Sequence, residues 1–90
     1  MTEINDPELN EVRKKLDKVD REILELIEER FELVNDVARI KKAKGLPLRD
    51  LKREEEVIKS KFGLTELPEE FVAKLYGLII DESVRQEEKY

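Results

Sequence analysis

Three basic residues in the first half of the chain have the types and spacing to bind an anion. Arg30 falls where a repeat of apolar residues would otherwise place leucine or isoleucine, and Lys41 follows eleven residues later. On a helix these two cations lie about 20° apart, so they share one face. Arg13 precedes Arg30 by seventeen residues, roughly 26 Å along the same helix. Within one chain the two arginines could not grip one small molecule, but an antiparallel partner chain could bring them together.

The position of Arg30 in the apolar repeat has two interpretations. A buried guanidinium without a counter-charge is costly, so a plain helical seam should avoid it. One interpretation is a polar residue that sets the register of a coiled coil or extends its charged end into solvent. The other is an arginine that points into a cavity and receives an anion.

The residues around these cations predict one long helix over 7–44. Asp6 is a good N-cap and Pro7 suits the first helical position. Gly45 ends the helix, and the lysines in its last turns interact favourably with the negative end of the helix dipole. A helix of this length spans roughly 57 Å, whereas a compact chain of this size has a radius of gyration of about 12 Å. Its apolar seam therefore needs a partner, most simply a second copy. With Arg30 counted in, the seam steps alternate three and four residues. The apolar positions of the seam are Leu9, Val12, Leu16, Val19, Ile23, Leu26, Leu33, Val37 and Ile40.

Two shorter helices are expected in the second half, which makes the chain all-α. Pro47 prevents the first helix from continuing, and Asp50 is a suitable N-cap for a helix over about 51–61. Pro68 opens a third helix over about 68–88. The buried stripe of that helix is expected to comprise Phe71, Val72, Leu75, Leu78, Ile79 and Val84.

Polar side chains also gather on these shorter helices. Asp50, Arg53 and Glu54 share a face of the second helix by their spacing, which is also what a cap with a surface ion pair would show. On the third helix Ser83 and Glu87 continue a stripe that is apolar before them. One interpretation is that these polar groups replace apolar ones to face a ligand, as proposed for Arg30. The other is that the apolar stripe simply ends before the end of the chain.

Composition narrows the function classes. Ninety residues suit a single domain, residues 1–90. The net charge of −5 argues against nucleic acid as a partner. Residues 39–53 nevertheless hold seven basic residues against one acid, which favours a small anionic ligand.

Further classes are excluded by residues that the sequence lacks. Without Cys or His, disulfides, thiolate chemistry, zinc binding and histidine acid–base catalysis are not expected. The first ten residues do not resemble a signal peptide, and no apolar run approaches a membrane span. We therefore expect a cytoplasmic protein with no membrane contact.

The chain resembles the all-helical chorismate mutases of the AroQ type over nearly its full length. The resemblance implies an intertwined, antiparallel helical homodimer of three-helix chains with two shared active sites. Its motifs are Val12-Arg13-Lys14-Lys15-Leu16-Asp17, Glu29-Arg30, Ile40-Lys41, Leu48-Arg49-Asp50, Arg53-Glu54 and Leu78-Ile79-Ile80-Asp81-Glu82-Ser83.

This resemblance also implies an activity, that of an isomerase in phenylalanine and tyrosine biosynthesis. The family converts chorismate, a small dianion, to prephenate by a Claisen rearrangement that needs no metal and no cofactor. The enzyme would restrict the conformation of the substrate and stabilise the charge that develops on its ether oxygen.

The site residues follow by the same resemblance. Arg13 from the partner chain and Arg30 would bind the two carboxylates, and Lys41 would reach one carboxylate and the ether oxygen. The catalytic residues would be Arg30, Lys41 and Glu87. Five further residues would bind the substrate. Arg13 would bind a carboxylate, and Asp50 and Glu54 would hold the ring hydroxyl. Arg53 would line the pocket, and Ser83 would contact a carboxylate.

Glu87 departs from a common family pattern, in which glutamine donates to the ether oxygen. Only a protonated carboxyl could donate there, so we expect Glu87 to work protonated and activity to fall as pH rises. Gln86 is the alternative donor, but on a helix it faces about 100° away.

Two other functions stay open at this point. One is a lyase on the same fold that removes pyruvate from isochorismate. The other is a non-enzymatic helical module for dimerisation or regulation, which would have no need of Arg13, Arg30, Lys41 and Arg53 at these spacings.

Overall fold

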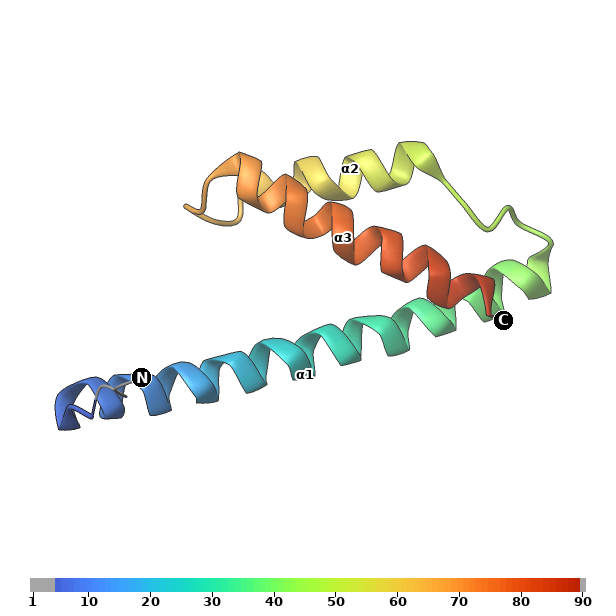
Figure 1. Ribbon diagram of the computed structural model, residues 1–90. Helices are drawn as coiled ribbons and strands as arrows, with labels where there is room; N and C mark the ends of the chain where they lie inside the picture. Colours follow the sequence, from blue (N-terminus) through green and yellow to red (C-terminus); the bar gives the residue numbers. More distant parts are fainter. Residues whose placement is uncertain (1–4, 90) are drawn as a thin grey trace. The chain divides into compact units, whose positions relative to one another are not determined.

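The computed structural model describes residues 5–89 (Figure 1), and in this part of the chain there are three α-helices and no strand. Helix α1 runs over Pro7–Lys44, α2 over Leu51–Phe62 and α3 over Glu69–Glu88. The prediction of an all-α chain with one very long N-terminal helix is confirmed. The second helix continues one residue further than predicted, and the third begins one residue later because Pro68 occupies its N-cap position. None of these helices is long and apolar enough to cross a membrane.

The chain divides into two compact units, the first ending at Arg30 and the second beginning at Phe31. In the described part of the first unit the backbone is helical from Pro7 onward, and Asp6 Oδ1 accepts a hydrogen bond of 3.0 Å from Leu9 N as an N-cap. No described residue of this unit is buried. Its apolar seam is open, with Leu16 55% and Leu26 64% exposed.

The second unit contains the last part of α1 together with α2 and α3. Helices α2 and α3 pack side by side (Figure 1). Among the described residues of this unit, the buried apolar ones are Ala38 of α1 and Val72, Ile80 and Val84 of α3. A core of this size leaves much of the apolar surface of the unit in contact with solvent.

The predicted buried stripe of α3 is only partly buried in the single chain. Val72 and Val84 lie inside, whereas Phe71 is 51% and Leu78 71% exposed. The inner face of α3 instead includes Ile80, which the sequence analysis did not assign to the stripe. Because α3 has apolar residues on most of its faces, the sequence pattern cannot show which face packs against the rest of the same chain.

Gly45 ends α1 in the way its position predicts. Its φ of 65° lies in the left-handed region, which costs glycine little and other residues more. Gly45 N donates to Lys42 O at 3.3 Å and Leu46 N donates to Lys41 O at 2.8 Å. This pair of hydrogen bonds is the Schellman motif, which satisfies carbonyls at the helix end.

Gly45→Ala is expected to destabilise the fold by about 1 kcal/mol, since alanine resists a positive φ. Gly63, the C-cap of α2, has a φ of −79° and serves as the matched control. A Cβ at either glycine meets no atom within 4 Å, so the two variants differ in backbone conformation alone. Gly63→Ala should be neutral or stabilising by about 0.5 kcal/mol. Denaturant unfolding at one protein concentration tests both, and equal stabilities would contradict the prediction.

Candidate active site

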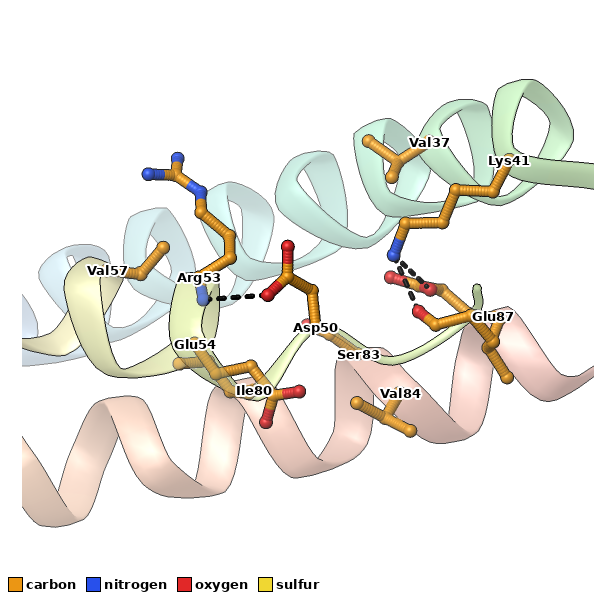
Figure 2. Close-up of a pocket in the computed structure, with 11 residues that line it drawn as sticks. Val37, Lys41, Asp50, Arg53, Glu54, Val57, Ile80, Ser83, Val84 and Glu87 are labelled. Carbon is orange, nitrogen blue, oxygen red and sulfur yellow. Dashed lines mark hydrogen bonds and ion pairs between the residues drawn. The ribbon is translucent and has the colours of Figure 1, made fainter. Parts of the chain in front are cut away.

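A pocket of about 200 Å³ lies in the second unit, between the end of α1, the start of α2 and the second half of α3 (Figure 2). Charged and polar side chains share its wall with apolar ones. The wall consists of Val37, Lys41, Leu48, Asp50, Arg53, Glu54, Val57, Ile80, Ser83, Val84 and Glu87.

Lys41 of α1 and Glu87 of α3 both line this pocket, where they form an ion pair (Figure 2). Lys41 Nζ donates to Glu87 Oε2 at 3.0 Å and to the Leu48 carbonyl oxygen at 2.6 Å. The two side chains are only 22% and 10% exposed, so solvent screens their attraction less than that of a surface pair. The ammonium group is thereby held at a defined place in the wall, with a carboxylate beside it.

Asp50 fixes the start of α2 next to the same pocket. Its Oδ1 accepts a hydrogen bond of 3.0 Å from Arg53 N (Figure 2), which confirms the predicted N-cap. A carboxylate at this position also interacts favourably with the positive end of the helix dipole. The cap therefore holds a negative charge at the pocket wall for a local structural reason.

Glu54 is engaged by an arginine that the sequence analysis did not assign to the site. Arg49 Nε donates to Glu54 Oε2 at 3.1 Å and Arg49 Nη2 donates to Glu54 Oε1 at 3.0 Å. The hydrogen bonds and charge of Glu54 raise the pKa of Arg49 above its ordinary value. A separation of five residues across a helix start is not a standard helical spacing, so periodicity offered no signal for this pair.

Ser83 and the two candidate donors at the end of α3 differ in placement. Ser83 is buried, and its hydroxyl donates to the Ile79 carbonyl oxygen at 2.7 Å, one turn earlier. Gln86 donates to Glu82 Oε2 at 3.1 Å and is not among the residues that line the pocket, whereas Glu87 is. The geometry therefore places Glu87, and not Gln86, in the pocket wall.

Six of the eight predicted site residues line this one pocket. The other two, Arg13 and Arg30, belong to the first unit and are not among its lining residues. The second unit thus supplies one lysine, one arginine and three carboxylates to the wall, a set able to bind a ligand that has both anionic groups and a hydroxyl.

The chain matches the profile of the family described as chorismate mutase type II over residues 12–88. It belongs to this family. Solved structures agree: a chorismate mutase from Thermus thermophilus has a TM-score of 0.85 at 37% identity, covering 90% of this chain and 94% of that one. A conserved hypothetical protein from Pyrococcus furiosus has a TM-score of 0.75 at 29% identity, covering 92% and 99%.

Curated relatives match over part of their length. A chorismate mutase from Methanocaldococcus jannaschii is 52% identical over 46 residues, which cover 51% of this chain and 46% of that protein. A bifunctional chorismate mutase/prephenate dehydratase from Aquifex aeolicus is 33% identical over 88 residues, or 91% of this chain but 24% of that protein. The alignments therefore span less than half of either relative.

Proposed function

We propose that the chain is a chorismate mutase, an isomerase that converts chorismate to prephenate. The observation that carries this proposal is the pocket of the second unit, where Lys41, Glu87 and two further carboxylates converge in a chain of the type II family. The product would feed phenylalanine and tyrosine biosynthesis. The prephenate dehydratase joined to the chorismate mutase of the Aquifex aeolicus relative supports a role in aromatic amino acid biosynthesis. A location in the cytoplasm stays a prediction.

Lys41 has the best placement for the chemical step. In the rearrangement the ether C–O bond breaks while a C–C bond forms, and negative charge develops on the ether oxygen. An ammonium held in a partly water-excluded wall stabilises such charge without having to reorganise. Its hydrogen bond to the Leu48 carbonyl, 2.6 Å long, would keep Lys41 in place when the ligand displaces Glu87.

The remaining pocket residues would bind and orient the substrate. Asp50 and Glu54 would accept a hydrogen bond from the ring hydroxyl, Arg53 would line the pocket and Ser83 would contact a carboxylate. The pocket would hold the flexible side chain of the substrate folded over its ring and so exclude unproductive conformers. In a unimolecular reaction, reaching the reactive conformer accounts for a large part of the barrier.

We further propose a homodimer with shared active sites, in which Arg30 and the partner's Arg13 bind the substrate carboxylates. Its support is the open seam of α1: Val12 is 53%, Ile23 48% and Ile40 53% exposed. Fully burying one such side chain is worth about 1.5–3 kcal/mol, so a seam of this length favours association with a complementary surface. A second copy supplies that surface by symmetry.

The proposed activity is tested by incubating the purified protein with chorismate and EDTA and identifying the product. Prephenate is expected. Lys41→Gln should lower kcat at least about a hundredfold, while Lys59→Gln, which removes a lysine 69% exposed on α2, should leave it unchanged. Pyruvate from isochorismate would instead identify a lyase, and a folded protein without turnover would favour a binding module.

Mixing two inactive variants tests the shared site. Arg13→Ala and Lys41→Ala, refolded together, should regain about a quarter of wild-type activity, because half the dimers are mixed and each has one intact site of two. Arg30→Ala mixed with Lys41→Ala is the control and should stay inactive, since every site then lacks one group. Equal results from the two mixtures would mean that Arg13 does not act across chains.

The role of Glu87 is tested by the pH dependence of kcat. A carboxyl that must donate to the ether oxygen should make the rate fall with rising pH, up to about tenfold per pH unit. Glu87→Gln supplies a permanent donor and should flatten the profile. Gln86→Ala should retain the wild-type profile. A flat wild-type profile would rule out a protonated Glu87.

A further inference from the structure

Arg49 lies just outside the pocket wall and contacts a residue that belongs to it. It stands one position before the N-cap of α2, and both oxygens of Glu54 accept hydrogen bonds from it, at 3.1 and 3.0 Å. A weaker contact of 3.9 Å joins Arg49 Nη2 to Asp81 Oδ1 of α3. Glu54 is 19% exposed, whereas Arg49 is 49% exposed. The arginine thus reaches a partly buried carboxylate from the solvent side.

This pair differs from two ion pairs that lie within α2 and α3. Lys59 with Glu55 and Lys74 with Glu70 are helical neighbours four residues apart, with all four side chains at least two-thirds exposed. Such pairs are typical of a solvated helix surface. The Arg49 pair instead uses two donors on two acceptors, which is the geometry that fixes the plane of a carboxylate.

The two hydrogen bonds from Arg49 leave Glu54 able to accept further hydrogen bonds. An ionised carboxylate has about four acceptor positions, and Arg49 occupies two of them. An ionised carboxylate donates no hydrogen bond, so Glu54 can act only as an acceptor in that form. Glutamate has three rotatable side-chain bonds, and a clamp on both oxygens restricts all of them before a ligand arrives.

We propose that Arg49 is a positioning residue, which holds Glu54 as an oriented acceptor for the ring hydroxyl of the substrate. This inference rests on the proposed function and on the binding role of Glu54 within it. Arg49 itself would not touch the substrate, since it is absent from the pocket wall. Asp81, 72% exposed and 3.9 Å away, would contribute little to the clamp.

A double-mutant cycle tests whether Arg49 acts through Glu54. Arg49→Gln and Glu54→Gln are each expected to lower kcat/KM about tenfold or more, and the double variant should resemble Glu54→Gln alone. Arg49→Lys should restore only part of the loss, because lysine lacks the fork of donors. The control is Arg85→Gln, which removes an arginine 72% exposed on α3 and paired with Glu82 at 3.3 Å. It should leave the kinetics unchanged.

A second measurement separates positioning from a purely structural role. With a chorismate analogue that has hydrogen in place of the ring hydroxyl, wild type and Arg49→Gln should have the same kcat/KM. An equal loss on chorismate and on the analogue would overturn the inference. If Arg49→Gln does not fold, Arg49→Lys takes its place in both measurements.

The remaining outcomes are also decisive. Additive effects in the cycle would mean that Arg49 acts independently of Glu54, and a faster Arg49→Gln variant would mean that Arg49 withholds Glu54 from the substrate. Either result overturns the inference while wild-type turnover leaves the proposed function intact. No turnover of chorismate by the wild-type protein would overturn the proposed function and the inference with it.

Discussion

The apolar seam of α1 is the constraint on which the rest of the structure depends. A helix of 38 residues presents apolar side chains at heptad spacing along nearly all of its length, and those described before Arg30 are not buried. Water contact on such a surface is unfavourable in proportion to its area. In the homodimer proposed above, the seam that stabilises association would also determine where the cations of α1 can meet a ligand.

Inside the second unit, charge neutralisation is the recurring device. The Lys41 ammonium has the Glu87 carboxylate, the Arg49 guanidinium has Glu54, and Asp50 caps a helix N-terminus. Partly buried charges are tolerated because each has such a partner. A dianionic substrate would have to compete with Glu87 for Lys41, so the affinity of this site would reflect a difference between two ion pairs.

The sequence was most informative where local chemistry decides the structure. Pro7, Gly45 and Asp50 act on the backbone next to them, and the helix boundaries fell within a residue of the predicted ones. It was less informative where a choice depends on packing. Phe71 and Leu78 are exposed because the face of α3 that contains them does not pack against the rest of the chain. Periodicity cannot distinguish a face that packs within the chain from one that packs against a partner.

The site shows the same division between local and spatial information. Resemblance to a family pointed to the residues that line the pocket, because motif order is visible in a sequence. The clamp of Arg49 on Glu54 was not visible, since it depends on the path of the chain between α1 and α2. Arg13 and Arg30 belong to the first unit, so the geometry of the pocket gives no information on their roles. Those roles depend on the mixing experiment.

The hydrogen bond from Lys41 to the Leu48 carbonyl has a consequence for how this chain can change in length. It ties the segment after α1 to the ammonium group itself, so an added or deleted residue between Gly45 and Asp50 would disturb the position of Lys41 in the pocket wall. The turn between α2 and α3 contributes no residue to the pocket wall. An insertion there would not lengthen any segment of that wall, and its loop-closure cost grows slowly with length. That turn is where an engineer could attach a tag or a second protein with least effect on the site.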